Sequence, residues 1–259
     1  MPRFAANLTM MFGEVPFADR FEAAADAGFA AVECLFPYPI PAARLSDTLR
    51  RLGLEQAMFN LHPGDWDAGE RGVACLPGRF SEVRSSVDLG LEYANASGAR
   101  RLHLMAGMAD ARDPEAAAAY RRSVEYAADR LAAEGIELLL EPINARSMPG
   151  YFLNDFATAE TLISELGRPN VRLQFDVFHR QIMHGDVTTA FRRLLPAIGH
   201  VQVASVPSRH EPRGEELNYD YVLRSIDDAG YLGFVGCEYV PRTTTLEGLS
   251  WLDPYRGRS

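Results

Sequence analysis

Short apolar runs alternate along this chain with longer stretches in which apolar residues recur every three or four positions. The short runs are typical of buried strands, and the longer stretches of amphipathic helices that cover them. The predicted strands are 4–8, 30–35, 54–61, 101–105, 136–140, 171–175, 200–204 and 233–237. The predicted helices are 16–27, 42–52, 80–97, 114–134, a helix capped by Asn154 that ends at Leu166, 187–195, 218–229 and a short C-terminal segment.

These eight strand–helix alternations predict a single-domain (β/α)8 TIM barrel over residues 1–259. A length of 259 residues suits one such barrel. A two-domain doubly wound fold is the structural competitor, but no glycine-rich turn of the GxGxxG type follows the first strand. Residues 62–78 form a predicted long loop, and a loop of this length in a compact domain is usually functional or disordered.

Composition narrows the function classes. A hydrophobic content of 47% supports a large core, and a net charge of −9 argues against binding to nucleic-acid backbones. The three cysteines form no CxxC pair, so we expect reduced thiols rather than a disulfide framework or a thiolate zinc site. The N-terminal stretch is too polar for a signal peptide, and no run approaches the ~20 apolar residues of a membrane span. We therefore expect a cytoplasmic protein with no membrane partner.

Oxygen-bearing side chains stand at the ends of four consecutive predicted strands. Glu141, Asp176, Gln202 and Glu238 each directly follow or end an apolar run. Active sites in TIM barrels gather at these carboxyl ends, and carboxylates brought together repel unless a cation or protons neutralise them. Oxygen ligands suit Mg²⁺ or Mn²⁺ better than Zn²⁺. Position alone leaves a metal site and ordinary capping or ion-pair roles equally open.

Two more polar positions lie just beyond these strands. His179 follows Asp176 by three residues and can bond a substrate oxygen or orient a neighbouring group, although a lone loop histidine is otherwise plain surface. Arg209 and Glu211 lie in the loop after the seventh strand. This arginine can hold a substrate carboxylate with two hydrogen bonds, and an ordinary loop ion pair with Glu211 is the alternative.

Longer motifs give the chain a family resemblance. They are RFAANLTMMFGE at 3–14, VECLFPY at 32–38, GDWDAGERGVACLPGR at 64–79, LLLEPIN at 138–144, QFDVFH at 174–179, GHVQVA at 199–204, ELNYDY at 216–221 and GCEYVPRTTTLEGLSWL at 236–252. With these motifs the whole chain resembles the hydroxypyruvate isomerases of the xylose-isomerase-like barrel superfamily. The stretch 64–79 and the last motif are specific to that family, whereas LLLEP and GCE alone indicate only the superfamily.

The resemblance implies a TIM barrel with one divalent cation, Mg²⁺ or Mn²⁺, whose family ligands fall on Glu141, Asp176, Gln202 and Glu238. Its acid–base pair falls on Glu141 and Glu238. In related epimerases, the positions of His179 and Arg209 contact substrate. The family interconverts hydroxypyruvate and tartronate semialdehyde, and a close branch isomerises 2-oxo-tetronates. Barrels of this superfamily often pair, so a homo-oligomer is one option, although nothing in the sequence identifies an interface.

The implied chemistry is an enediolate proton transfer. The cation would acidify the C–H between the carbonyl and hydroxyl carbons of the substrate, and the two glutamates would remove and return the proton. Arg209 or Arg71 would hold the substrate carboxylate. The chain departs from the family pattern at His62, at Ser205-Val206 and at Val240, so the substrate is less securely implied than the chemistry.

Three alternatives remain at this point. A ketose 3-epimerase would use the same fold, metal and carboxylates but would invert a stereocentre without moving the carbonyl. An apurinic-site endonuclease of the superfamily would need a histidine-rich trinuclear zinc cluster, whereas histidine is sparse here. A non-catalytic barrel protein would lack turnover, and the intact acid–base positions argue against it.

Overall fold

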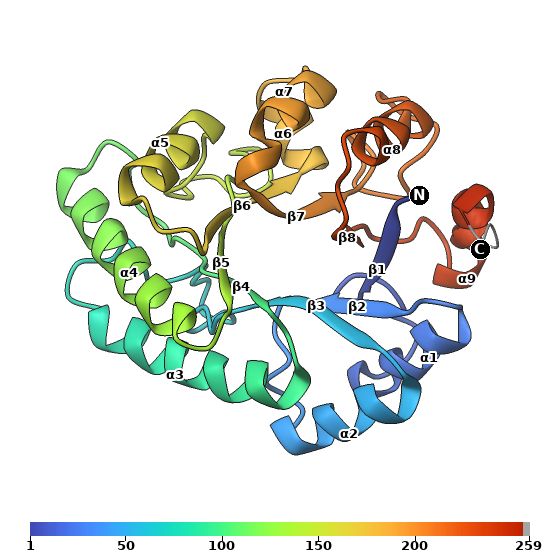
Figure 1. The fold of residues 1–259 in the computed structure, drawn as a ribbon, viewed down its shortest axis with the longest axis horizontal. Helices are drawn as coiled ribbons and strands as arrows, with labels where there is room; N and C mark the ends of the chain where they lie inside the picture. Colours follow the sequence, from blue (N-terminus) through green and yellow to red (C-terminus); the bar gives the residue numbers. More distant parts are fainter. Residues whose placement is uncertain (256–259) are drawn as a thin grey trace.

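Eight parallel strands close into a barrel in which each strand pairs with its neighbours in chain order, and β8 returns to β1. The computed structural model describes residues 1–255. Figure 1 looks into the barrel and shows the helices arranged around it. The strands are β1 Arg3–Asn7, β2 Ala31–Cys34, β3 Glu55–Asn60, β4 Arg101–His103, β5 Glu137–Leu140, β6 Val171–Asp176, β7 Ile198–Val203 and β8 Phe234–Cys237. The predicted TIM barrel is confirmed.

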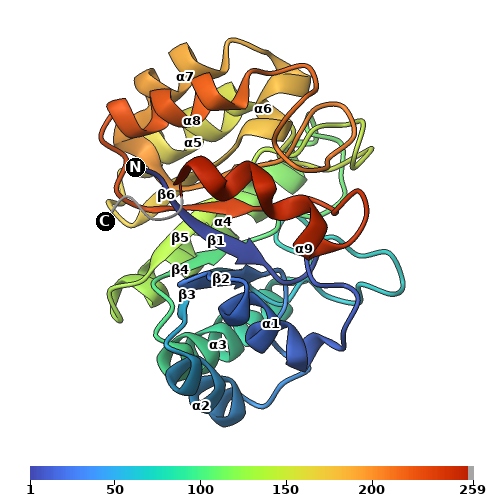
Figure 2. The same cartoon turned by 90° about the vertical axis from the view of Figure 1, so that its right-hand side faces the viewer.

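The helices follow the strands in alternation. They are α1 Arg20–Asp26, α2 Ala42–Leu52, α3 Phe80–Ser97, α4 Pro114–Ala132, α5 Phe156–Leu166, α6 Val177–Met183, α7 Val187–Leu194, α8 Tyr219–Asp228 and α9 Thr245–Gly248. Short 3₁₀ turns precede α1 (η1 Phe17–Asp19), follow α7 (η2 Leu195–Ala197) and end the described chain (η3 Leu249–Tyr255). Figure 2 shows the C-terminal segment beside β1, where the Phe4 and Trp251 rings meet edge to face at 5.2 Å. Within residues 1–255, no helix combines the length and apolar character needed to span a membrane.

Side-chain caps explain where several helices begin. The carboxylate of Asp155 accepts from the backbone N–H of Thr158, so Asp155 rather than the predicted Asn154 caps α5. Asn218 caps α8 in the same way, through the N–H of Tyr221. The helix α6 is absent from the sequence-based prediction, which placed the whole segment after β6 in a loop. It begins immediately after β6, with Asp176 as its cap.

The barrel interior is apolar at its amino end and polar at its carboxyl end. The helices pack apolar faces against the outside of the strands in one large cluster of buried residues. Buried polar side chains gather at or near the carboxyl ends of all eight strands: Asn7, Glu33, Asn60, His103, Glu141, Gln174, Asp176, His200, Gln202 and Glu238. Buried charge is costly unless it is paired or binds a cation, so this layer locates the candidate site.

Candidate active site

A small, partly enclosed cavity lies over this polar layer. Its volume is about 270 Å³, which suits a small metabolite rather than a polymer. Its apolar wall includes Leu35, Met58, Met105 and Ile143, and its polar wall includes Glu141, His179, Gln202, Arg209, Glu238 and Arg71. The structure therefore brings six of the seven predicted site residues to one cavity, and the seventh, Asp176, lies directly behind them.

Three carboxyl groups crowd this end of the barrel. Glu141, Asp176 and Glu238 expose only 6%, 1% and 7% of their surface. Burial raises the pKa of Glu141 well above its ordinary value, and the charges of Glu238 and Asp176 raise it further. Burial also raises the pKa of Asp176 to about 6 and that of Glu238 to about 8, although Arg209 opposes both shifts. The three acids repel one another, and together they carry more negative charge than one arginine balances.

The two oxygens of Asp176 have different surroundings. Oδ1 accepts a 2.7 Å hydrogen bond from the backbone N–H of Phe178 at the start of α6. Oδ2 is buried without a hydrogen-bond partner and lies 3.5 Å from His179 Nε2 and 3.8 Å from Arg209. A buried carboxylate oxygen without a hydrogen-bond donor has a strong affinity for a cation. Asp176 thus orients α6 with one oxygen and offers the other to the site.

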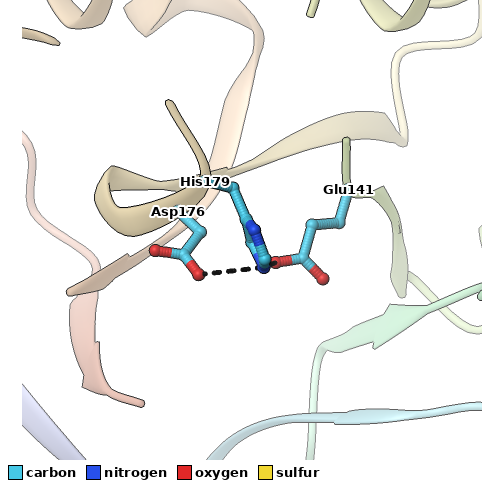
Figure 3. A group of neighbouring side chains, drawn as sticks. All are labelled: Glu141, Asp176 and His179. Carbon is cyan, nitrogen blue, oxygen red and sulfur yellow. Dashed lines mark ion pairs between the residues drawn. The ribbon is translucent and has the colours of Figure 1, made fainter. Parts of the chain in front are cut away.

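His179 projects from the first turn of α6 toward Asp176 and Glu141 (Figure 3), and its Nε2 lies 3.9 Å from Glu141 Oε1. Ligand atoms of these three residues lie within 4.8 Å of one another, close enough to hold a metal ion. The backbone N–H of Asn144 donates to Nδ1 of His179 at 3.3 Å, so Nδ1 carries no proton. Burial keeps the pKa of His179 well below its ordinary value. The neutral ring therefore turns an Nε2–H donor toward the cavity, which suits a substrate oxygen better than a metal.

Arg209 is the cation nearest to the acids. Its guanidinium donates to Glu238 Oε2 at 2.5 Å and lies over the Phe178 ring at 4.9 Å. The alternative of an ordinary loop ion pair with Glu211 is wrong: Glu211 is buried and accepts instead from the backbone N–H of Arg242. Arg209 has a positive φ of 55°, a conformation that is uncommon outside glycine and often found at functional sites.

Two of the departures from the family pattern, Ser205 and Val240, contact Arg209 through the backbone. The Arg209 N–H donates to the carbonyl of Ser205 at 2.9 Å, and the Arg209 carbonyl accepts from the N–H of Val240 at 2.9 Å. The side chain of Val240 is half exposed, so its identity matters less than its backbone. His62 lines a separate cavity beside α3, together with Glu70 and others. The effect of these departures on the choice of substrate stays a prediction.

Arg71 reaches the cavity from the long loop 62–78. Its guanidinium stacks over the Trp66 ring at 3.8 Å and donates to the carbonyls of Trp66 and Glu70. Gly72 fixes the loop, because a Cβ there would lie 2.2 Å from the carbonyl oxygen of Met105 and its φ is 100°. The loop therefore packs closely against the segment after β4 and forms part of the cavity wall. Trp66 lines the cavity as well.

Gln202 lies at the end of β7, with both ends of its amide engaged. Oε1 accepts from Gln174 Nε2 at 2.6 Å, and Nε2 donates to Glu33 Oε1 at 2.8 Å. Sequence reasoning missed Glu33, Gln174 and His200. Their signal was present as polar residues inside the apolar strand runs VEC, LQF and IGHVQV, where only an inward-facing polar cluster would place them.

Comparisons with known proteins agree with this geometry. Residues 21–255 match the family model described as xylose isomerase-like TIM barrel. The chain is 51% identical to a 2-oxo-tetronate isomerase of Cupriavidus necator over 100% of both chains. It is 43% identical to a hydroxypyruvate isomerase of Escherichia coli, over 99% of this chain and 100% of that protein. The chain belongs to the xylose isomerase-like TIM-barrel family, in its group of hydroxypyruvate and 2-oxo-tetronate isomerases.

Solved structures extend the comparison. A Brucella melitensis protein described as AP endonuclease, family 2 shares 49% identity and a TM-score of 0.96 over 99% of this chain and 100% of that one. An L-ribulose 3-epimerase superposes with a TM-score of 0.73 at 22% identity, covering 100% of this chain and 89% of that one. At that identity the likeness shows only the fold.

Proposed function

We propose that this protein is a divalent-cation-dependent isomerase that interconverts the keto and aldehyde forms of a three- or four-carbon hydroxy-oxo acid. The observation that supports this proposal most is one partly enclosed cavity of about 270 Å³ whose wall contains two buried glutamates and two arginines. A 2-oxo-tetronate is the first substrate to test, because the Cupriavidus necator relative at 51% identity has that name. Hydroxypyruvate is the second, in line with the Escherichia coli relative.

The acids and amide at the strand ends fit Mg²⁺ or Mn²⁺. Glu141, Asp176, Gln202 and Glu238 supply oxygen ligands only, the set that these hard cations prefer. Three carboxylates and the guanidinium of Arg209 sum to a charge of −2 when ionised, which one divalent cation balances. The unpartnered Oδ2 of Asp176 supports the same assignment. When bound, the cation polarises the substrate carbonyl and stabilises the negative charge that develops on it.

The two glutamates are placed for opposite ends of a proton transfer. Glu141 follows β5 and Glu238 follows β8, with β6 and β7 between them in the closed sheet. A substrate in the cavity therefore lies between the carboxyl groups of the two glutamates. One glutamate takes the proton from the carbon that bears the hydroxyl, and the other donates a proton to the neighbouring carbon. The hydroxyl proton moves to the former carbonyl oxygen, which completes the exchange of the keto and aldehyde forms. His179 holds a substrate oxygen through its Nε2–H.

Arg71 is the residue that binds the substrate carboxylate in this proposal. Arg209 already donates to Glu238, whereas among the described residues no carboxylate pairs with Arg71. The Trp66 ring and two backbone carbonyls hold Arg71 in place without neutralising it. A guanidinium held in this way is preorganised to bind a carboxylate with two hydrogen bonds.

A substrate panel followed by NMR in D₂O with Mg²⁺ or Mn²⁺ tests the proposal. We expect carbonyl migration in a 2-oxo-tetronate or hydroxypyruvate, with solvent deuterium entering the product. Inversion of a ketohexose without carbonyl migration would instead make the protein a 3-epimerase. Cleavage of abasic DNA would indicate the activity named for the Brucella melitensis neighbour. Turnover of none of these substrates, together with stabilisation by the cation, would indicate a binding protein.

A further inference from the structure

Glu33 is a buried acid that the proposed reaction does not use. It lies on β2, has no exposed surface, and is surrounded by side chains from β1 and β7. Its Oε1 accepts from Asn7 Nδ2 at 2.9 Å and from Gln202 Nε2 at 2.8 Å. Its Oε2 lies 2.6 Å from His200 Nε2. Every polar contact of the Glu33 carboxylate thus faces inward, and one of them reaches a proposed cation ligand.

This contact decides which way the Gln202 amide faces. The nitrogen and oxygen of an amide are nearly equal in size, so packing alone does not choose between the two orientations. A carboxylate only accepts hydrogen bonds, so the end of Gln202 that meets Glu33 must be the NH₂ group. Oε1 of Gln202 then faces Gln174, which also lines the cavity, and it keeps a second lone pair.

The barrel leaves room for this arrangement at one position of β8. A Cβ on Gly236 would lie 2.2 Å from Glu33 Oε2 and 2.4 Å from Oε1. Any other residue at that position would overlap the Glu33 carboxylate, so the carboxylate or the strand would have to shift. Gly236 therefore lets Glu33 reach across the barrel interior to His200 and Gln202.

We propose that Glu33 is a positioning residue, which fixes the Gln202 amide so that its oxygen faces the divalent cation. The inference rests on the proposed cation site and adds a group that does not touch the cation. Partners that orient a metal ligand in this way typically change metal affinity by about 10–100-fold when they are lost. Glu33 also accounts for an amide at this position, because the amide supplies the donor that the carboxylate requires.

Direct titration of Mn²⁺, by calorimetry or by the electron paramagnetic resonance of the free ion, tests this without measuring activity. Glu33→Met removes the acceptor at similar volume, and we expect its Mn²⁺ affinity to fall by about 10–100-fold. Glu33→Gln keeps one acceptor oxygen, and His200 can change tautomer because its Nδ1 has no partner. This conservative variant should stay within about threefold of wild type, since orientation rather than charge is what Glu33 supplies.

Two further proteins isolate the contact. In a Gln202→Ala background, Glu33→Met should change Mn²⁺ affinity no further, because the group it positions is gone. Gln56→Met is the matched control, since Gln56 is another buried amide of the barrel, bonded to the carbonyl of Met58 at 2.8 Å. Its loss should lower the free energy of unfolding without moving Mn²⁺ affinity.

The outcomes separate cleanly. Unchanged affinity in Glu33→Met, equal losses in Glu33→Gln and Glu33→Met, or additive losses with Gln202→Ala would each overturn the positioning role while leaving the cation site intact. Failure of the wild-type protein to bind Mn²⁺ would overturn the cation site and this inference with it. If Glu33→Met does not fold, Gln202→Glu serves instead. In the Gln202→Glu protein two carboxylates face each other, so this protein should bind Mn²⁺ poorly. Adding Glu33→Gln should restore Mn²⁺ binding, and a failure to restore it would refute the inference.

Discussion

Glu141 and Glu238 are both buried carboxyl groups, but their immediate neighbours differ in charge. Glu238 forms an ion pair with Arg209. Glu141 instead lies between two imidazoles, His103 at 3.8 Å and His179 at 3.9 Å. Burial lowers the pKa of His103 to about 3, so this ring is neutral as well. Of the two glutamates, only Glu238 has a cationic partner in contact, so the two carboxyl groups bind a proton with different affinity.

The acid–base pair is tested by removing each carboxylate in turn. Glu141→Gln and Glu238→Gln keep the side-chain volume but cannot accept a proton, so each should lower turnover by about 10²–10⁴-fold. Both variants should also lose exchange of substrate hydrogen with D₂O, followed by NMR. Circular dichroism checks that each is folded. Full exchange in either variant would remove that residue as a base.

Recognition of the substrate carboxylate is tested at Arg71. Arg71→Met should raise KM by about 10–100-fold, since a charge-assisted hydrogen bond contributes roughly 1.5–3 kcal/mol. The effect on kcat should be smaller. Arg20→Met is the matched control: Arg20 also donates to backbone carbonyls and lies 5.9 Å from an aromatic ring, Phe17, away from the cavity. Equal KM values for Arg71→Met and wild type would exclude Arg71 from substrate binding.

At the scale of elements, β8 lies so close to the Glu33 carboxylate that the position of Gly236 has no room for a side chain. Gly236→Ala should destabilise the fold by about 1–3 kcal/mol, because the new methyl group overlaps the carboxylate in a packed interior. Urea unfolding measures this change. Gly13→Ala is the control, since a Cβ on Gly13 meets nothing within 4 Å. A Gly236→Ala protein as stable as the control would show that the barrel interior rearranges around the new methyl group at little cost in free energy.

The elements were predictable from the sequence to different degrees. The helix predicted at 80–97 is present as α3, Phe80–Ser97. It could be predicted because its 18 residues carry several turns of apolar periodicity. The helix α6 has seven residues, too few to display a period, and it begins at a residue interpreted as a strand-end ligand. The site residues that follow strands were found by position. Glu33 was missed because only the closed barrel brings β2 opposite β7.

At the scale of the whole molecule, barrel closure collects three acids from separate strands in one buried place. A divalent cation that binds there should stabilise the fold by mass action, by about 2.7 kcal/mol at a hundredfold excess over Kd. For a chain of this size, each kcal/mol raises Tm by roughly 2–4 °C. Thermal unfolding in EDTA, Mg²⁺ and Mn²⁺ measures the shift, with Ca²⁺ and NaCl as ionic controls. An identical Tm in EDTA and Mn²⁺ would argue against a cation site.

The same three acids give stability a pH dependence whose sign is fixed. The folded pKa values of about 6 for Asp176 and about 8 for Glu238 lie above the ordinary values of 3.8 and 4.5, mainly because of burial. Between these limits the folded protein binds more protons than the unfolded chain, so its stability falls as pH rises. Burial lowers the pKa of His103 and His179, so these rings gain protons on unfolding below the ordinary histidine pKa and oppose the trend there. In EDTA, the free energy of unfolding should therefore decrease most clearly from about pH 7 to pH 8, where these histidines are neutral in both states.

A bound cation should reverse this trend, because it keeps the carboxylates ionised and binds more tightly as protons leave them. Urea unfolding at each pH, with EDTA and with Mg²⁺, should give curves that meet at pH 5 and diverge toward pH 8. Parallel curves would mean that the cation binds elsewhere. A flat curve in EDTA would mean that these acids titrate normally in the folded barrel. Divergence that disappears in Glu238→Gln would locate the linkage at the proposed site.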